Sequence, residues 1–558
     1  LASLYRTTII LVMGLKYFPK GFKPSSTQQY AIPNIVDAFK DNKFVVIQGP
    51  TGCGKSFIAK TIANSLNKPP ARLTKLIHNY SAFETSWENN RRVYEYADDF
   101  NEGKRYGTSI LTTTKALQDQ YIRDFDDIKP LKGKSSYICN IDDRSTADAA
   151  PCAFSSKLKK ECWDCNRCDY YESRNNSIAA KISIENYSSF FHKPDHLKNR
   201  QLIVCDEASE LENVIVSRYS CSIECGKLNK YGFSLPYSAN RKRFYDNLCT
   251  LYSNLESRYV ELLRMLDKHH DTISEDRKKE FKFITDLKGD LSLITNTWSQ
   301  SEYIIHSVYE RNKKYIKLIP KKIDNLAQHL FQYADKVLLM SATFVDYKSF
   351  MRGLGIPDHE YKYIDLPSTF DPKKSPIMFG NFHLSKKNLE NSFPKIVGCV
   401  KEILQEHKND KGLIHTQSNK ITSMLKDNIR SKRILYRIRG YKDNIDILNE
   451  HLNTEAPTVL ASPSMSFGVD LKGDAARFCI IIKCPWPDLG DVRIKEMSKN
   501  NYKWYSNKMF TTFIQQCGRC TRNENDASIT YVLDAGGIRK LIPDYLNLLP
   551  KYFIDRFV

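Results

Sequence analysis

The sequence predicts an α/β protein in which parallel strands alternate with helices in more than one domain. Two observations predict this class. Short apolar runs such as 44–48 and 337–340 alternate with helical patterns along most of the chain. The chain also has 558 residues, which is too many for one hydrophobic core and predicts three or four domains.

Charge and cysteine content narrow the class of protein and its surroundings. Lys and Arg number 84 against 64 Asp and Glu, a formal net charge of +20, which favours a polyanionic partner. Fifteen cysteines, with no segment typical of a secretory leader, favour reduced thiols, so we expect a cytoplasmic protein, in the host cytoplasm if the chain is viral. The apolar run at 9–13 is too short to span a bilayer, and we expect no membrane role.

A phosphate-binding loop follows the first predicted strand. Residues 44–48 (FVVIQ) lead into G-P-T-G-C-G-K-S at 49–56, and 57–66 reads as a helix. Backbone N–H groups of such a loop face phosphates, the lysine neutralises the β- and γ-phosphates, and the serine hydroxyl binds Mg²⁺. The predicted nucleotide-binding residues here are Gly49, Thr51, Gly52, Gly54, Lys55 and Ser56.

Two carboxylates stand at the end of another predicted strand. Asp206 and Glu207 follow the apolar run 202–205, which places them at the ligand-binding edge of a parallel sheet. Together with the phosphate loop they make chemical sense, because Asp206 can hold Mg²⁺ through water and Glu207 can polarise the water that attacks a γ-phosphate.

Two later motifs complete the candidate nucleotide site. Strand 337–340 leads into S-A-T at 341–343, and Q-Q-C-G-R-C-T-R at 515–522 supplies Gln515, Arg519 and Arg522. The two arginines are three residues apart and suit one helix face, from which guanidinium groups can stabilise a phosphoryl-transfer transition state. Taken alone, this motif is equally consistent with surface arginines.

The ordered set of motifs resembles superfamily 2 helicases, and the segments 112–120 and 462–471 resemble the XPD/DinG family in particular, closest to its DinG-like members. The resemblance extends from about residue 21 to 534. It implies two RecA-like P-loop motor lobes around Mg²⁺ and ATP, with Gln28 before the phosphate loop, Gln29 being its possible substitute, and Asp470 coupling nucleotide to DNA. The implied activity is ATP-dependent DNA unwinding with 5′→3′ translocation on single-stranded DNA.

The same resemblance implies partners and a setting. We expect the protein to bind single-stranded DNA and duplex/single-strand junctions as a monomer, in DNA repair or replication.

Five cysteines lie within thirty residues between the phosphate loop and the acidic pair. They are Cys139, Cys152, Cys162, Cys165 and Cys168. Four thiolates suit either an iron–sulfur cluster or zinc, and spacing alone does not separate these. The surrounding residues resemble the iron–sulfur segment of DinG-like helicases, which implies a [4Fe-4S] cluster on Cys139, Cys152, Cys162 and Cys168. Cys165 stays an alternative ligand.

A helical insertion follows the acidic pair. Apolar residues recur in steps of three and four over 244–266 and 284–298, and a capping box from Thr272 to Glu275 is expected to start the second helix. By resemblance this is the arch domain. The expected domains are lobe 1 at 13–138, 171–212 and 318–345, the iron–sulfur domain at 139–170, the arch at 213–317, and lobe 2 at 346–558.

Two positions depart from the family pattern and two other functions remain open. Ser209 replaces a histidine of the acidic box, and 534–536 replace an Asp-x-Arg, so coupling and one nucleotide contact are in doubt. The alternatives are an RNA or RNA–DNA hybrid helicase, since backbone contacts need not read the sugar, and a regulatory nucleic-acid-binding protein that uses ATP as a clamp.

Overall fold

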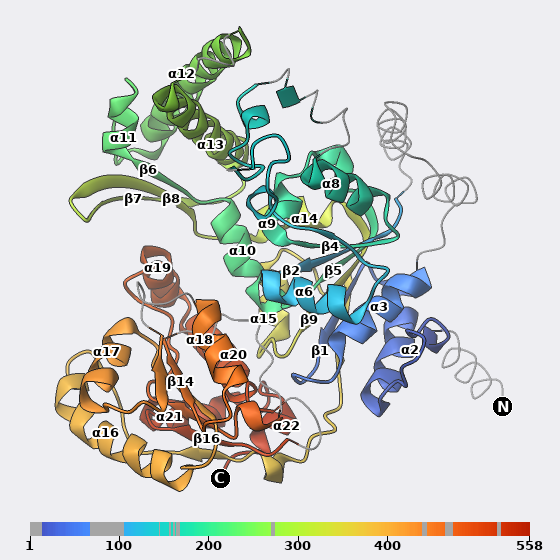
Figure 1. The fold of residues 1–558 in the computed structure, drawn as a ribbon, viewed down its shortest axis with the longest axis vertical. Helices are drawn as coiled ribbons and strands as arrows, with labels where there is room; N and C mark the ends of the chain where they lie inside the picture. Colours follow the sequence, from blue (N-terminus) through green and yellow to red (C-terminus); the bar gives the residue numbers. More distant parts are fainter. Residues whose placement is uncertain are drawn as a thin grey trace.

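The structure is a computed structural model. It describes residues 14–66, 105–143, 145–155, 158, 159, 162, 168–268, 274–437, 444–463, 473–521 and 526–558. Two parallel sheets form two lobes, and long helices with a small antiparallel sheet rise from the first lobe (Figure 1). Among the described residues, none of the helices combines the length and apolar composition needed to cross a membrane.

The first lobe is built on a sheet of seven parallel strands within the described residues, in the order β10-β1-β9-β5-β2-β4-β3. Its central strands are buried apolar runs because helices cover both faces of the sheet, whereas the edge strands β3 and β10 are only partly buried. The strands are β1 (Phe44–Gln48), β2 (Thr108–Thr112), β3 (Lys129–Leu131), β4 (Ile182–Asn186), β5 (Arg200–Cys205), β9 (Ala334–Ser341) and β10 (Tyr361–Asp365).

Helices of lobe 1 divide between the two faces of this sheet. One face packs against α2 (Ser26–Asp41), α3 (Lys55–Leu66) and α6 (Lys115–Asp124). The other packs against α9 (Tyr187–His192), α10 (Leu211–Arg218), α14 (Asp324–Phe331) and α15 (Tyr347–Gly353). A further helix, α8 (Asp169–Ala179), packs against β3 and β4.

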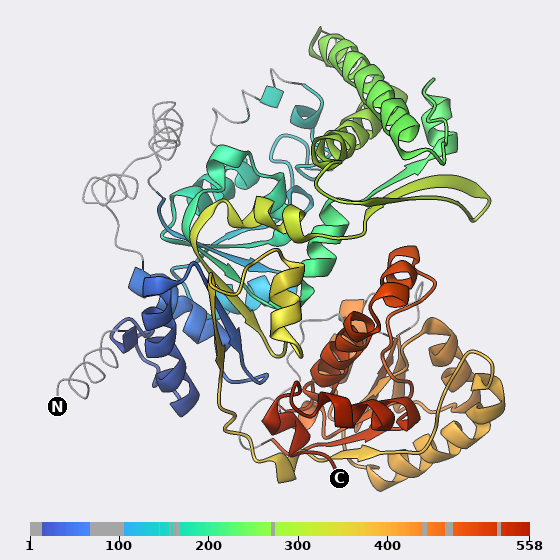
Figure 2. The ribbon, with the colours of Figure 1, turned by 180° about the vertical axis from the view of Figure 1, so that it is seen from behind.

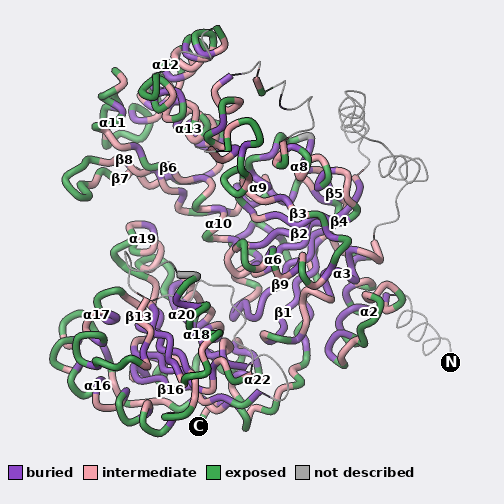
Figure 3. The backbone as a smooth tube through the Cα atoms, in the orientation of Figure 1, coloured by how far each residue is buried: buried purple, intermediate pink, exposed green. Residues whose placement is uncertain are grey.

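The second lobe repeats this design with six parallel strands in its described part, in the order β11-β16-β15-β12-β14-β13. They are β11 (Ile377–Phe379), β12 (Gly412–His415), β13 (Ile434–Tyr436), β14 (Val459–Ser462), β15 (Phe478–Ile481) and β16 (Ile529–Val532). One face is covered by α16 (Leu389–Glu406) and α17 (Asn419–Asn428). The other is covered by α18 (Asn444–Asn453), α20 (Tyr502–Cys517), α21 (Gly536–Tyr545) and α22 (Lys551–Ile554). Figure 3 shows the buried strands at the centre of each lobe.

The helical insertion forms an antiparallel hairpin of α12 (Arg241–Lys268) and α13 (Glu275–Thr297), as the apolar periodicity predicts. It packs on α11 (Cys225–Lys230) and on a three-stranded antiparallel sheet of β6 (Cys221–Glu224), β8 (Lys313–Pro320) and β7 (Tyr303–Glu310). The N-cap of α13 is Ser274, whose hydroxyl accepts from the backbone N–H of Arg277. The expected cap Thr272 lies outside the described residues.

The sheet of lobe 1 continues past the expected boundary at residue 345. Strand β10 at Tyr361–Asp365 pairs in parallel with β1, so the chain adds an edge strand to lobe 1 before it crosses to lobe 2. The sequence did not indicate this strand because it is short and only partly buried. We therefore propose that lobe 2 begins after Asp365 and keep the other expected boundaries as a proposal.

A candidate nucleotide-binding cleft between the two lobes

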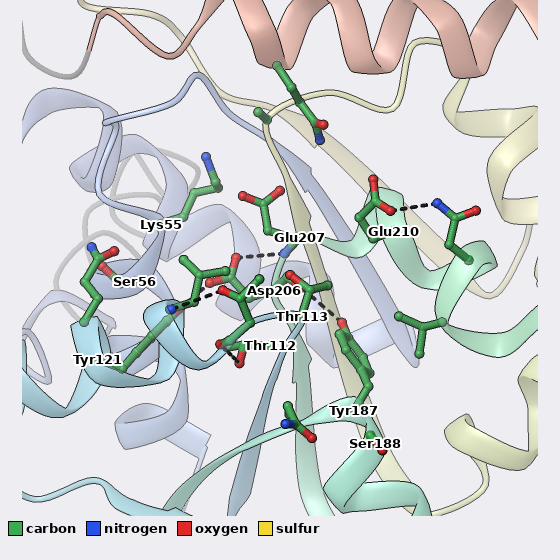
Figure 4. Close-up of a pocket in the computed structure, with 18 of the residues that line it drawn as sticks. Lys55, Ser56, Thr112, Thr113, Tyr121, Tyr187, Ser188, Asp206, Glu207 and Glu210 are labelled. Carbon is green, nitrogen blue, oxygen red and sulfur yellow. Dashed lines mark hydrogen bonds between the residues drawn. The ribbon is translucent and has the colours of Figure 1, made fainter. Parts of the chain in front are cut away.

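A cleft of about 1030 Å³ opens between the lobes and collects most of the predicted nucleotide-site residues (Figure 4). Lobe 1 contributes the phosphate loop, the acidic pair and the ends of β2 and β4. Because parallel strands of one sheet end at the same edge, these segments meet there although Thr51 and Glu207 are 156 residues apart in sequence. Lobe 2 contributes Gln417, Pro463, Thr512, Gln515, Gln516 and Arg519.

The phosphate loop has the backbone that its glycines predict. Gly52 and Gly54 have φ of 86° and 77°, a backbone conformation that residues with a Cβ rarely adopt. The positive φ favours glycine at Gly54, and a Cβ there would lie 2.1 Å from the Gln28 amide nitrogen and displace that side chain. The Lys55 ammonium donates to the carbonyls of Gly49 and Pro50, at 3.0 and 3.2 Å, and therefore lies over the loop.

Gln28 is the glutamine that faces the loop. It forms a capping box with Ser25 at the start of α2, and its amide donates to the Gly54 carbonyl at 3.3 Å. Gln29 instead donates to the Pro24 carbonyl on an exposed face. Of the two glutamines that the sequence left open, the geometry favours Gln28.

The acidic pair lies directly opposite Lys55 (Figure 4). The Asp206 carboxylate accepts hydrogen bonds from the Tyr121 hydroxyl at 2.9 Å and from the Glu207 backbone N–H at 3.0 Å. Burial, followed by the Glu207 charge, raises the pKa of Asp206 to about 6, although Lys55 and the hydrogen bond from Tyr121 oppose the rise. Burial makes the charged form of Asp206 unfavourable. A divalent cation bound to the carboxylate would stabilise that charged form, so the group is suited to bind one.

Ser209 joins the two lobes at the base of the cleft. The Ser341 hydroxyl donates to the Ser209 hydroxyl oxygen at 2.9 Å, and the Gln515 amide donates to the same oxygen at 3.2 Å. Gln515 lies on α20 of lobe 2, so the serine at the variant position of the acidic box still contacts both other motifs. The position whose role in coupling the sequence put in doubt therefore still joins the two lobes through hydrogen bonds.

The glycine of the lobe 2 motif contacts the phosphate loop. A Cβ at Gly518 would lie 3.1 Å from the Thr51 hydroxyl, closer than most Cβ contacts in proteins, so the two lobes leave little room for a side chain at this point. Arg519 follows immediately and lines the cleft, but α20 ends at Cys517, so Arg519 does not lie on a helix face as the sequence suggested. Arg522 and Asp470 lie outside the described residues.

The cysteine segment between β3 and α8 consists mostly of loops and short turns in its described part. Cys139 and Cys162 are buried, and Cys168 caps α8. Burial raises the pKa of Cys152, a hydrogen bond with Cys162 lowers it, and the charges of Cys168 and Cys139 raise it, so Cys152 interacts with each of the other three predicted ligands. Within the described residues no three His, Cys, Asp or Glu side chains are arranged to hold a single metal ion, and Cys165 is not described.

A partly buried ionic network, which the sequence did not indicate, forms a second contact between the lobes. Glu212 on α10 of lobe 1 accepts from Arg493 at 2.7 Å, from Lys508 at 2.9 Å and from the Trp504 indole at 3.1 Å. All three donors belong to α19 (Val492–Asn500) and α20 of lobe 2. No spacing rule links Glu212 with Arg493, which are 281 residues apart, so only the fold reveals this network.

Two protein-family models match parts of the chain. Residues 401–553, in lobe 2, match the Helicase C-terminal domain. Residues 27–177, which contain the phosphate loop and the cysteine segment, match Novel STAND NTPase 3. No curated protein sequence matches the chain.

The fold is similar to those of solved XPD structures. The structure named XPD_Helicase is 15% identical with a TM-score of 0.55, and the match covers 94% of this chain and 98% of that one. XPD_APO is 14% identical with a TM-score of 0.54, covering 92% and 97%. Xpd4 of S. tokodaii is 13% identical with a TM-score of 0.52, covering 95% and 99%. The chain therefore has a helicase-like fold of two α/β lobes over nearly its whole length.

Proposed function

We propose that the protein is an ATP-dependent DNA helicase that moves along single-stranded DNA and unwinds duplexes. The observation that carries this proposal is the cleft itself, in which Lys55, Asp206 and Glu207 of lobe 1 face Gln515 and Arg519 of lobe 2. A site divided between two lobes can convert nucleotide binding into lobe movement, because the nucleotide contacts both of them.

Each side chain has a role that its position supports. Lys55 and the loop N–H groups bind the β- and γ-phosphates, and Ser56 with Asp206 would hold Mg²⁺, which neutralises phosphate charge when bound. Glu207 orients the attacking water, and Arg519 reaches the γ-phosphate from lobe 2. Gln28 adds a contact beside the loop, while Asp470 and Arg522 are kept as proposed members of the site.

We further propose that Cys139, Cys152, Cys162 and Cys168 hold a [4Fe-4S] cluster. The interaction of Cys152 with the other three thiols and the scarcity of regular structure around them support this, since a loop segment of this kind has little apolar core of its own. When bound, the cluster supplies a covalent centre on which these loops fold. Anaerobic purification should give a brown protein with about four irons per chain. A colourless protein with one zinc would contradict the cluster.

The nature of the strand and the direction of movement extend the proposal. We expect binding to single-stranded DNA and junctions, 5′→3′ movement and a monomer, with a role in repair or replication. Strand displacement on matched DNA, RNA and hybrid substrates with either overhang tests these points. Preferential unwinding of RNA or of hybrids would replace DNA as the substrate.

DNA-stimulated ATP hydrolysis tests the motor. Lys55→Ala and Glu207→Gln should nearly abolish turnover, and Arg519→Ala should lower it on the order of 10³-fold. Glu256→Gln is the matched control, because this carboxylate pairs with Lys288 at 3.0 Å in the helical insertion and does not line the cleft. Unchanged turnover in the Lys55 and Glu207 variants would reject the site.

A regulatory ATP clamp is the second candidate, favoured by the match of 27–177 to an NTPase model other than a helicase model. Such a protein would bind ATP and nucleic acid tightly but turn over slowly, without displacing strands. Measurement of ATP affinity together with turnover separates the two, since a motor shows turnover stimulated by the strand.

A further inference from the structure

The outer half of the β7–β8 ribbon projects freely from the helical insertion. Strand β6 pairs with β8 from Tyr315 to Leu318, and within the described part of the chain the ribbon beyond Tyr315 consists of two strands alone. Figures 1 and 2 show it extending past the helices of the insertion, above α19 of lobe 2. A two-stranded ribbon is marginally stable in water, so contacts with the rest of the insertion must stabilise this extension, and a functional role would account for its projection.

The ribbon is anchored at its root and exposed at its end, which we call the ribbon tip (residues 309–314). Ile316 and Leu318 are buried in the core of the insertion. At the other end, Arg311 and Asn312 have φ of 48° and 64°, the left-handed pair of a tight hairpin turn whose twist matches the strands. The tip therefore has a defined shape although it is exposed to solvent.

The ribbon tip presents one aromatic ring beside several cations. Tyr309 is 72% exposed, and it lies directly opposite Lys314 on the same face of the ribbon. Lys313 is paired with Glu224 at 2.8 Å, whereas Arg311 and Lys314 have no ion pair with any described residue. Two cations and a ring are thus available to a partner.

We propose that the ribbon tip binds single-stranded nucleic acid, in addition to the strand-binding surface of the motor lobes that the proposed function requires; this rests on the proposed function. A base can stack on Tyr309, and Arg311 and Lys314 can contact the adjacent phosphates, which is the combination that sequence-independent single-strand binding uses. A protein partner fits less well, because an interface core needs clustered apolar groups and residues 310–314 are Glu, Arg, Asn, Lys and Lys.

The root of the ribbon links this site to the motor. Arg493 of lobe 2 donates to the backbone carbonyls of Pro320 and Lys321 at 2.9 and 3.0 Å, at the point where β8 returns to lobe 1. The same guanidinium binds Glu212. The root of the ribbon is therefore connected to both lobes, and the eight residues of β8 separate it from the tip. A nucleic-acid strand bound at the tip would be linked to both lobes through this extended segment.

Oligonucleotide affinity tests the proposal. Fluorescence anisotropy would measure wild type and Tyr309→Ala with labelled single strands of about 8 and about 40 nucleotides, as DNA and as RNA. Loss of one stacked base should weaken binding of the long strand by about fivefold or more. The short strand can occupy the motor lobes alone, so its affinity should not change. The double variant Arg311→Ala/Lys314→Ala should reduce the salt dependence of long-strand binding by about two phosphate contacts.

Two controls make the result specific. Tyr309→Phe keeps the ring and should bind like wild type, and Tyr237→Ala removes a ring that is 50% exposed elsewhere in the insertion and should have no effect. Wild-type affinity of the Tyr309→Ala and double variants for the long strand, or an equal loss in Tyr237→Ala, would overturn the ribbon site and leave the motor intact. A wild-type protein that binds neither strand would overturn both proposals.

Discussion

Removal of the Glu212 carboxylate should loosen the contact between the lobes without unfolding either of them. The side chain belongs to lobe 1, and its donors Arg493, Lys508 and Trp504 all belong to lobe 2. Glu212→Ala would leave two cations facing each other in a partly buried place with no anion between them. Because all the lost hydrogen bonds and ion pairs join the two lobes, the substitution should destabilise the closed arrangement of the lobes and not the core of either lobe.

The structure sets the size of this effect. Burial by itself would raise the pKa of Glu212, yet Lys508 and Arg493 outweigh it and lower the pKa from 4.5 to about 2. At about 1.4 kcal/mol for each pH unit, this corresponds to about 3 kcal/mol of stabilisation of the carboxylate. Loss of one partner from a buried ion pair costs a similar amount, about 3–5 kcal/mol. The equilibrium between closed and open lobes should therefore shift on the order of 100-fold.

Hydrogen exchange and ATP kinetics would measure the shift. Amides of α10, α19 and the first half of α20 should exchange faster in Glu212→Ala, and the KM for ATP should rise, while the thermal midpoint of each lobe core changes little. Since the pKa of Glu212 is depressed, the network forms above pH 4.5 and is lost only as the pH falls through about 2, so the difference should be constant from about pH 5 to 8. Glu496→Gln, which breaks an exposed pair with Lys499, is the control. Exchange in α10 and α20 that matches wild type would refute the reasoning.

Three further predictions concern the cleft. Because burial raises the pKa of Asp206 to about 6, ATP hydrolysis should fall as the pH drops below about 6, and more Mg²⁺ should move that midpoint lower; a midpoint independent of Mg²⁺ would speak against Asp206 as the metal-binding group. Gly518→Ala places a Cβ 3.1 Å from the Thr51 hydroxyl, so the KM for ATP should rise about two- to tenfold with little change in melting temperature, and an unchanged KM would mean that the lobes do not meet there during turnover. Ser209→Ala removes the acceptor of Gln515 and should reduce strand-stimulated turnover by up to about tenfold, whereas Ser209→His should retain part of it; equal turnover in all three proteins would exclude a coupling role.

Local signals allowed the sequence to predict the separate parts of the molecule. The strand, loop and helix at 44–66 appear as β1, the phosphate loop and α3, because glycine spacing and an apolar run specify them without help from distant residues. The apolar periodicity of 244–266 and 284–298 likewise predicts the helical hairpin. Strand β10 at Tyr361–Asp365 was not predicted, because its place at the edge of lobe 1 depends on pairing with a strand more than 300 residues earlier.

The candidate site shows the same division. Lys55 and Asp206 could be predicted from motifs, since phosphate and Mg²⁺ chemistry restricts the residue types and their spacing. Their hydrogen-bond partners could not be predicted in the same way. The bonds from Tyr121 to Asp206 and from Gln515 to Ser209 depend on which helices pack beside the cleft.

The sequence by itself determined the class of fold, the phosphate loop and acidic pair, and the group of cysteines, because each is encoded in a short stretch whose chemistry is local. Only the tertiary structure decided which glutamine faces the loop, where lobe 1 ends, how Glu212 joins the lobes and that Tyr309 projects into solvent. These features depend on the packing of segments that can be more than 300 residues apart. No local sequence pattern specifies such contacts, because neither a residue type nor a fixed spacing is tied to them.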